Sequence, residues 1–263
     1  MKIKVRFINA FTDVLFKGNS AAVIITDDWL SDSVMQLIAT ENNLSETAFL
    51  KPLTAEKFEI RWFSPITEID FCGHATLAAS FVIFAKNHLL KKLTFITKSV
   101  GDLTIIEESN GYIQMSLPNL QPKKLVDIPD ALIKGLTIAP KEVLLSEQAY
   151  FVIYNSENDV HNVNYKSYLL KQLAPFDVVV TARSDQYDFV SRYFWPANGG
   201  DEDPVTGSIH AGLAPYWSEK LNKSNLSAFQ ASLRGGELKC IVDDDRVYVS
   251  GKAVQYLEGE ISV

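Results

Sequence analysis

Apolar positions in the first half of the chain alternate with polar ones over short segments, with the two-residue period of β-strands. This alternation predicts strands at 4–11, 21–26, 46–52, 57–64, 93–98, 102–108 and 112–118. Helical spacing is found at Leu30, Val34, Leu37 and Ile38, which predict a helix over about 28–40 that begins at Asp27–Asp28. The segment 72–88 is apolar at nearly every position, and a helix of that composition has to be buried on every side.

The second half of the chain repeats this plan. A short helix is predicted over about 129–136, and a second apolar helix over about 206–221. Strands are predicted around them at 142–147, 149–155, 177–183, 188–195, 226–232, 238–245, 246–251 and 253–263. Because strands outnumber helices and each half has one buried helix, the pattern indicates an α+β fold and not a chain of βαβ units.

A short motif supports the idea of a duplicated chain. Arg-Trp-Phe-Ser-Pro begins at Arg61, and Arg-Tyr-Phe-Trp-Pro begins 131 residues later at Arg192, about half of the 263-residue chain away. Each copy is followed by an acidic loop, a glycine and an Ala-rich apolar stretch. We therefore predict an N-terminal domain over 1–118, to which 251–263 returns, and a C-terminal domain over 123–250, joined by the Pro-flanked segment 118–122.

Charge and hydropathy exclude two classes of partner. The net charge of −7 comes from 25 basic and 32 acidic residues, which leaves no basic stripe for the phosphates of a nucleic acid. No apolar run approaches the roughly 20 residues that span a bilayer, and the N-terminus predicts a strand, not a signal peptide. The remaining expected partner is a small anionic metabolite, and the base rate for soluble oligomers favours a homodimer.

Cysteine and histidine usage bears on location and cofactors. Two cysteines cannot form a disulfide framework, which indicates the reducing cytoplasm. Four scattered histidines without a Cys-x-x-Cys motif argue against structural zinc. Neither a Gly-x-Gly-x-x-Gly motif nor a P-loop is present, so a nucleotide cofactor has no support and we expect none.

Each half places a glycine and a small polar residue at the start of its buried helix, Gly73–His74 in the first and Gly207–Ser208 in the second. The first N–H groups of a helix lack internal partners and carry partial positive charge. Two such ends brought together would bind a carboxylate or an oxyanion. These residues could instead only cap two core helices, but their matched positions in a duplicated chain favour a site.

Acidic residues near these helix starts are candidates for proton transfer. Asp203 precedes Pro204, which suits the first turn of a helix and would make Asp203 its N-cap. An acid there could also orient a histidine such as His74. Glu46 lies between a predicted helix and a strand among apolar neighbours, a setting that suits a residue that takes and returns a proton, although most glutamates on loops are simply solvated.

Several segments together resemble the PhzF-like, or phenazine biosynthesis-like, family. They are Phe-x-Gly-Asn-x-Ala-Ala-Val-Ile at 16–24, Ser-Glu-Thr-Ala-Phe at 45–49, Arg-Trp-Phe-Ser-Pro to Cys-Gly-His-Ala-Thr at 61–76, Arg-Tyr-Phe-x-Pro to Asp-Pro-Val-Thr-Gly-Ser at 192–208 and the Gln-x-x-x-Arg-Gly-Gly loop from Gln230. The similarity runs nearly end to end, with Ser20 where the family usually has proline. It implies the diaminopimelate epimerase-like fold, in which two similar α+β domains each wrap a barrel-like, mostly antiparallel sheet around a central helix. It also implies an active site in the cleft between the domains, where the matched helix starts face each other.

The resemblance implies roles for particular residues. Glu46 corresponds to the catalytic glutamate of the family, and His74, Asp203 and Ser208 correspond to the residues that support it. The residues expected to bind substrate are Gly18, Asn19, Gly73, Gly207, Arg234 and Gly235. The implied chemistry is a cofactor-independent and metal-free isomerisation in which Glu46 moves a proton on a small carboxylate-bearing metabolite.

Two other functions stay open on the sequence. Amino-acid racemases of this fold use two cysteines, one before each buried helix, and Cys72 occupies the first of these positions. The second position has no cysteine near Gly207, and Cys240 lies far downstream, so half of a two-base apparatus is missing. A protein that binds a small metabolite without turning it over would keep the same residues.

Overall fold

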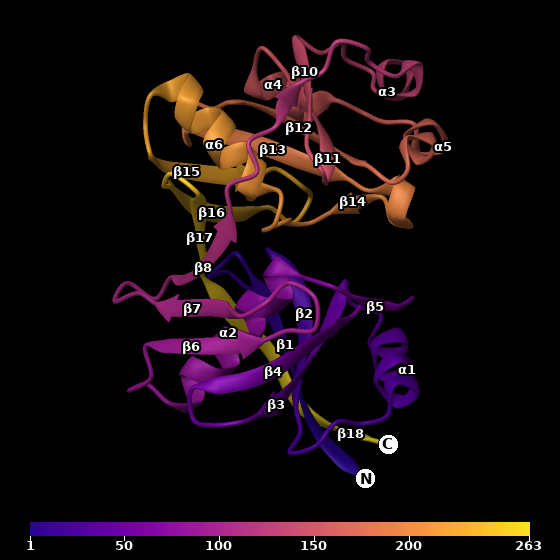
Figure 1. Ribbon diagram of the computed structural model, residues 1–263. Coiled ribbons are helices and arrows are strands. Elements are labelled where there is room, and N and C mark those ends of the chain that lie inside the picture. The colour runs from indigo at the N-terminus through magenta and orange to yellow at the C-terminus, as the bar shows by residue number, and fades with distance from the viewer. The chain divides into compact units, whose positions relative to one another are not determined.

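The computed structural model describes residues 1–263, which form two compact units (Figure 1). Unit 1 comprises Met1–Ser116 and Ser250–Val263, and unit 2 comprises Leu117–Val249. Each unit contains a mostly antiparallel sheet and a buried helix, so the α+β class predicted from the sequence is confirmed.

Unit 1 is built on a single sheet. Its hydrogen-bonded strands lie in the order β18 (Ala253–Ser262), β1 (Lys2–Ala10), β2 (Asn19–Ile25), β3 (Glu46–Pro52), β4 (Lys57–Phe63), β6 (Lys92–Ile96), β7 (Leu103–Glu107) and β8 (Ile113–Pro118). Helix α1 (Asp32–Asn42) connects the parallel pair β2 and β3, and helix α2 (Gly73–Lys86) connects the parallel pair β4 and β6. The two-residue strand β5 (Glu68–Ile69) pairs with the end of β4, just before α2 begins.

Unit 2 is built in the same way. Its strands lie in the order β9 (Lys123–Lys124), β10 (Glu142–Leu145), β11 (Ala149–Ile153), β12 (Asp177–Arg183), β13 (Phe189–Phe194), β15 (Asn225–Gln230) and β16 (Gly236–Val242), followed in the chain by β17 (Arg246–Gly251). The two-residue strand β14 (Glu202–Asp203) pairs with β13, and helix α6 (His210–Leu221) connects the parallel pair β13 and β15. The remaining helical segments are α3 (Asp130–Gly135), α4 (Glu157–Asn162), α5 (Ser167–Leu170), η1 (Lys171–Leu173) and η2 (Pro196–Asn198).

The two sheets repeat one pattern of strand pairing. The pairs β1–β2, β2–β3, β3–β4, β4–β5, β4–β6 and β6–β7 are in turn antiparallel, parallel, antiparallel, antiparallel, parallel and antiparallel. The pairs β10–β11, β11–β12, β12–β13, β13–β14, β13–β15 and β15–β16 have the same directions in the same order. The duplication inferred from the Arg-aromatic-Phe motif is therefore present in the topology.

Both apolar helices are buried, as their composition predicts. Every residue of α2 from Gly73 to Ser80 is buried, and α2 packs against β1, β2, β3 and β18 (Figure 1). The hydroxyl groups of its Thr76 and Ser80 bond one turn back along the chain, Thr76 Oγ1 to the Cys72 carbonyl at 2.6 Å and Ser80 Oγ to the Thr76 carbonyl at 2.7 Å. Neither α2, α6 nor any other helix is both long and apolar enough to cross a membrane.

Helix α6 contains a proline that frees a backbone acceptor for the start of unit 2. Pro215 has no N–H, so it cannot bond to the carbonyl of Ala211 one turn earlier. The N–H of Leu120 donates to that carbonyl instead, at 3.0 Å. The Pro-flanked segment 118–122 is thereby fixed against the buried helix.

Two predicted helix starts are wrong. Helix α1 begins at Asp32 and not near Asp28, because Ser31 is its N-cap and accepts a hydrogen bond from the Val34 N–H at 3.3 Å. The short helices α4 and α5 were not predicted at all, although the capping box Ser156–Asp159 is a sequence signal for α4.

The predicted start of α6 is also wrong. The helix begins at His210, and Gly207 and Ser208 lie in the turn before it. Asp203 belongs to β14 and is not the N-cap, a position held by Ile209 without a side-chain cap. The Asp203 carboxylate accepts a hydrogen bond from Thr206 Oγ1 at 2.5 Å and so stabilises the loop that precedes the helix.

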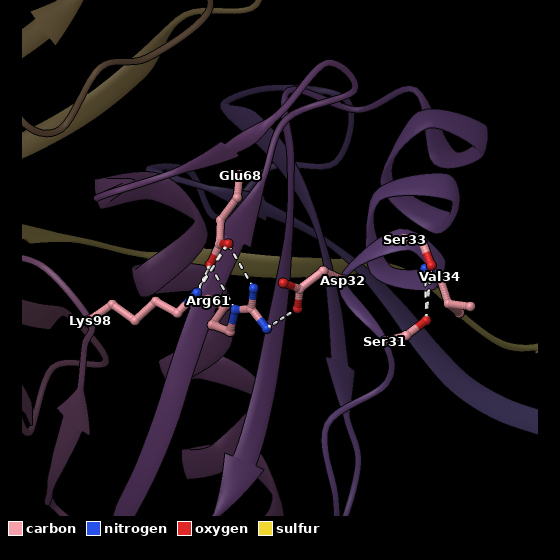
Figure 2. Close-up of polar contacts among 7 residues, drawn as sticks. All are labelled: Ser31, Asp32, Ser33, Val34, Arg61, Glu68 and Lys98. Carbon is pink, nitrogen blue, oxygen red and sulfur yellow. Dashed lines mark hydrogen bonds and ion pairs between the residues drawn. The ribbon is translucent and has the colours of Figure 1, made fainter.

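The repeated arginine forms the same contact in both units. The Arg61 guanidinium on β4 donates from Nε and Nη2 to the two carboxylate oxygens of Glu68 on β5, both at 2.7 Å, and from Nη1 to Asp32 in the first turn of α1 at 2.8 Å (Figure 2). Such two-point pairing is the strong form of the Arg–carboxylate interaction. It holds the short strand and the crossover helix against the same strand of the sheet.

In unit 2, Arg192 on β13 makes the matching two-point contact with Glu202 on β14, at 2.8 and 2.9 Å. Its Nη1 donates to the Val163 carbonyl beside α4 at 2.8 Å. Both guanidinium groups also lie over a phenylalanine two residues further along their strand, Phe63 at 5.2 Å and Phe194 at 5.0 Å from the ring centroid. The repeated Arg-aromatic-Phe motif therefore has a structural role. We call the two-point contacts of Arg61 with Glu68 and of Arg192 with Glu202 the clamp.

Removing the clamp should cost stability. In Arg61→Gln we expect the free energy of unfolding to fall by about 2–3 kcal/mol, somewhat less than for a fully buried pair because the Glu68 side chain is 29% exposed. Lys98→Gln is the matched control, since the Lys98 ammonium contacts the same carboxylate at 3.3 Å but is 63% exposed, and it should cost less than about 1 kcal/mol. Urea denaturation measures both variants, and equal losses would contradict the structural role of Arg61.

Candidate active site

The first cluster of candidate residues lies in unit 1, where a strand start meets a helix start. Glu46 is the first residue of β3 and His74 is the second residue of α2. The Glu46 Oε2 atom lies 2.9 Å from His74 Nε2, and the two side chains are 13% and 6% exposed. The structure thus brings together two of the four predicted catalytic residues. The acid in contact with His74 is Glu46, and not Asp203, which the sequence offered as an acid that orients this histidine.

Asn19 and Cys72 complete this cluster. The side-chain amide of Asn19, the first residue of β2, lies 3.1 Å from His74 Nδ1, and Ser45 Oγ donates to Asn19 Oδ1 at 3.1 Å. The Cys72 Sγ atom lies 3.5 Å from Glu46 Oε2 and 3.4 Å from His74 Nδ1. Both ring nitrogens of His74 therefore have polar neighbours, which fixes the orientation of the ring.

Burial sets the protonation states of this cluster. It raises the pKa of the Cys72 thiol to about 11, so this thiol is protonated near neutral pH. Burial by itself lowers the pKa of His74, whereas Cys72 and Glu46 beside the ring raise it, and the net shift is upward.

The hydrogen bonds of Glu46 are confined to one of its two oxygens. His74 Nε2 and Cys72 Sγ both contact Oε2. Neither contact uses Oε1. A carboxylate held at one oxygen has a fixed orientation and keeps the other oxygen for proton exchange.

The same side chains could hold a metal ion. One ligand atom each from Glu46, Cys72 and His74 lies within 4.8 Å of the others. Carboxylate, thiolate and imidazole together are a donor set that suits zinc. The metal-free site expected from the sequence stays a prediction.

The loop before β2 places Asn19 through a glycine that no other residue could replace. Gly18 has φ +66°, and a Cβ atom at this position would lie 2.2 Å from the Ala10 carbonyl oxygen and 2.6 Å from Thr12 Cγ2. Gly18 therefore serves backbone geometry, and it supports Asn19, which is fully buried.

The second cluster lies in unit 2 around Asp203. Gln230, the last residue of β15, donates from Nε2 to the Asp203 carbonyl at 2.8 Å and accepts from the Thr206 N–H at 2.8 Å. With the Asp203–Thr206 hydrogen bond, these contacts fix the loop that leads to Gly207 and Ser208. Ser208 Oγ accepts a hydrogen bond from Gln148 Nε2 at 3.0 Å.

Arg234 and Gly235 lie in the loop between β15 and β16. Gly235 has φ +66°, and a Cβ atom there would meet the Phe229 ring at 2.7 Å, so glycine is required for close packing. Partial burial lowers the pKa of Arg234 from its usual value, although the group stays charged near neutral pH. Gly73, the remaining predicted binding residue, is the first residue of α2 and is preceded by Cys72, which makes no side-chain cap hydrogen bond.

Comparison with known protein families decides the identity of the fold. The family model described as phenazine biosynthesis-like protein matches residues 8–259. The chain belongs to this family. The family and the fold expected from the sequence are thus confirmed.

Relatives of known sequence and structure agree with this family. The chain is 43% identical to an uncharacterized isomerase of Halalkalibacterium halodurans, over 99% of each chain, and 36% identical to the phenazine biosynthesis-like domain-containing protein of Bos taurus, over 100% of each. A PhzF-family crystal structure from Enterococcus faecalis superposes with a TM-score of 0.94 at 39% identity, over 100% of both chains. A hydroxyproline epimerase from Agrobacterium vitis, solved with bound trans-4-hydroxy-L-proline, has a TM-score of 0.61 at 8% identity over 99% of this chain and 91% of its own, so it shares the fold alone. The names of the relatives support an isomerase-type function.

The residues that connect the predicted ones were missed. Ser45, Thr206 and Gln148 each bond to a predicted site residue, and none was singled out. Gln230 begins the Gln-x-x-x-Arg-Gly-Gly motif, which by itself gives this residue no role. A signal was nevertheless present. Adding the offset of 131 to Gly18 and Asn19 gives positions 149 and 150, directly after Gln148.

Gly18 should tolerate substitution far less than a glycine in open space. In Gly18→Ala we expect the free energy of unfolding to fall by about 2–5 kcal/mol, because strain at positive φ adds to the clash with Ala10. Gly101→Ala is the control, since Gly101 has φ +78° but no atom within 4 Å of an added Cβ, and it should cost about 1–2 kcal/mol. Thermal unfolding compares the two, and a loss at Gly101 as large as at Gly18 would contradict the steric explanation.

Proposed function

We propose that this protein is a cofactor-independent isomerase in which Glu46 transfers a proton between two carbons of a small carboxylate-bearing metabolite. The observation that carries the proposal is the buried contact between Glu46 Oε2 and His74 Nε2 at 2.9 Å. The relatives named as isomerases support the same class of reaction.

The reaction needs no electron donor or acceptor. Glu46 Oε1 removes a proton from a carbon activated by an adjacent carboxylate or double bond, and the electron pair of the broken C–H bond moves into the conjugated system. The same carboxyl group then returns the proton to another carbon, so product and substrate have the same composition. His74 Nε2, at 2.9 Å from Oε2, orients the Glu46 side chain so that Oε1 faces the substrate.

Other predicted residues would bind the substrate and stabilise developing charge. The first N–H groups of α2, beginning at Gly73, have no partners within the helix and point out of its N-terminus. Asp203 and Ser208 of unit 2 are proposed to contribute hydrogen bonds to the same substrate. If they do, Asp203→Asn and Ser208→Ala will slow the reaction of a folded protein, as loss of a transition-state hydrogen bond does.

A racemase with Cys72 as one base is the second candidate, because the Cys72 thiol contacts Glu46 and His74. Two observations count against it. Burial raises the pKa of this thiol to about 11, whereas a catalytic thiol needs a lowered pKa. The position in unit 2 that corresponds to Cys72 is Thr206, as the matching i to i−4 hydrogen bonds of Thr76 and His210 indicate.

A screen for proton exchange tests the function without knowledge of the substrate. The protein is incubated with pooled carboxylate metabolites in D₂O, and incorporation of deuterium into carbon is detected by mass. An isomerase exchanges a carbon-bound hydrogen of its substrate with solvent, whereas a binding protein does not. Ligand binding detected by calorimetry without any exchange would support the non-catalytic alternative and contradict the proposal.

Glu46→Gln should separate proton transfer from binding. The substitution keeps the shape of the side chain but removes the group that carries the proton, so exchange into the substrate found in the screen should fall by at least about 10²–10⁴-fold. Affinity for the same compound should stay within a few-fold. Glu41→Gln, at an exposed position of α1, is the matched control and should leave exchange unchanged. If exchange in Glu46→Gln is undiminished, Glu46 is not the base and another residue has this role.

Cys72→Ser should leave exchange within about tenfold of the wild type, because serine preserves the size of the side chain and the proposed mechanism gives the thiol no proton to carry. Iodoacetamide at pH 7.5 should likewise not inhibit exchange, since the thiol is buried and protonated. A loss as large as that of Glu46→Gln, together with protection of the thiol by substrate, would favour the racemase.

A further inference from the structure

The duplication of the fold assigns a counterpart to Glu46 in unit 2. Glu46 begins β3 and lies opposite Ala21 of the parallel strand β2. Asp177 begins β12 and lies opposite Ala149 of the parallel strand β11. Asp177 follows Glu46 by 131 residues, the offset that also separates the two clamp arginines. A carboxylate therefore occupies the same topological position in both units.

The two carboxylates have different neighbours. Glu46 contacts His74 directly, whereas Asp177 is connected by a chain of hydrogen bonds to Ser208, in the turn before α6. Tyr193 Oη donates to Asp177 Oδ2 at 2.7 Å, and Gln148 Nε2 lies 3.0 Å from both Tyr193 Oη and Ser208 Oγ. The position of Tyr193 in unit 1 is taken by Trp62, whose buried indole N–H has no partner.

The direction of each hydrogen bond in this chain follows from its first member. An ionised carboxylate only accepts, so the phenol O–H of Tyr193 has to donate to Asp177. Tyr193 Oη is then left with a lone pair for Gln148, which has to present its NH₂ group and not its carbonyl. The second N–H of that group donates to Ser208 Oγ. Ser208 Oγ is consequently the acceptor of this hydrogen bond, and its own proton is not donated to Gln148.

This chain of hydrogen bonds needs an ionised Asp177 and a protonated Tyr193. The net effect on Asp177 is a raised pKa, because burial raises it more than the hydrogen bonds from Tyr193 and from the side-chain amide of Asn198, at 2.8 Å from Oδ1, lower it. Burial and the negative charge of Asp177 raise the pKa of Tyr193 well above its usual value. Tyr193, in the middle of the chain of hydrogen bonds, is 4% exposed, whereas Asp177, Gln148 and Ser208 are only partly buried.

We infer that Asp177, Tyr193 and Gln148 are positioning residues that hold the Ser208 hydroxyl as a hydrogen-bond donor toward an anionic group of the substrate. This inference rests on the proposed function for the role of Ser208 in the reaction. The direction of the hydrogen bonds rests on the contacts within unit 2 and on an ionised Asp177 carboxylate. Glu46 is thus proposed to carry a proton in unit 1, whereas its counterpart in unit 2, Asp177, fixes the Ser208 hydroxyl as a donor.

Neutron diffraction from crystals of the free protein tests the direction of the bonds without any substrate. We expect deuterium on Tyr193 Oη directed at Asp177, both deuterons of the Gln148 amide directed at Tyr193 and Ser208, and the Ser208 deuteron directed away from Gln148. A Ser208 deuteron directed at Gln148, or a deuteron on Asp177 at neutral pH, would overturn the inference whatever the protein catalyses.

Gln148→Glu tests the consequence for the reaction, because it keeps the shape of the side chain and replaces a donor by an acceptor. The Ser208 hydroxyl should then turn toward Glu and be lost to the substrate. Exchange into the substrate identified in D₂O should fall about 10²-fold, as far as in Ser208→Ala, and the double variant should be no slower than either single one. Tyr154→Phe is the control. It removes a buried hydroxyl of the same unit, which donates to the Ile138 carbonyl at 3.0 Å outside this chain, and should leave exchange unchanged.

The outcomes separate the two hypotheses. Additive losses in Gln148→Glu and Ser208→Ala would show that Gln148 does not act through Ser208 and would overturn the inference. If neutron diffraction finds the expected directions but Ser208→Ala exchanges as fast as the wild type, the role of Ser208 in the proposed function fails, and with it the positioning role of the chain. Thermal unfolding of each variant identifies a loss that comes only from unfolding.

Discussion

The arginine–carboxylate clamp is the interaction on which the geometry of both candidate clusters depends. Arg61 joins β4 to β5 and to the first turn of α1 (Figure 2). Arg192 joins β13 to β14 and to the end of α4. Each short strand precedes a buried helix, and candidate residues lie in or beside this segment, His74 at the start of α2 and Asp203 and Ser208 before α6. A buried guanidinium needs its carboxylate, because an unpaired charge in this position would be strongly destabilising. The clamp therefore fixes the path of the segment before each helix start, and the stability of the sheet and the placement of the site residues rest on one contact.

The second constraint is the parallel pairing on either side of each crossover helix. A parallel strand pair requires a long connection, so the residue that begins the returning strand is positioned by the sheet and not by a flexible loop. Glu46 and Asp177 both occupy this place. What differs is the residue on the neighbouring strand, Trp62 in unit 1 and Tyr193 in unit 2, and whether the segment at the start of the buried helix provides an imidazole or a hydroxyl. A few side-chain differences on one backbone plan thus separate a carboxylate placed beside a histidine from one that anchors a hydrogen-bonded chain.

Much of the fold was predictable because periodicity depends on the nearest neighbours in sequence. The strand at Glu46–Pro52 and the buried helix at Gly73–Lys86 follow from alternation and from uniform apolarity. The starts of α1 and α6 were not predictable in this way. Asp28 and Ser31 are both good caps, and the additional contact between Asp32 and Arg61, 29 residues away, is absent from any local pattern. The turn before His210 is held by Gln230, 24 residues from Thr206.

The same limit applies to the candidate site. The resemblance to a family identified Glu46, His74, Asp203 and Ser208, but a motif does not say which side chain contacts which. The pairing of Glu46 with His74 and the path from Asp177 to Ser208 appear only when the sheet brings strand starts and helix starts together. The offset of 131 residues is the exception, because it converts a role assigned in one unit into a position to inspect in the other. In a duplicated protein, the second copy is therefore a source of hypotheses. Where two corresponding residues have the same chemical type but different partners, as Glu46 and Asp177 do, the two units are expected to have different roles.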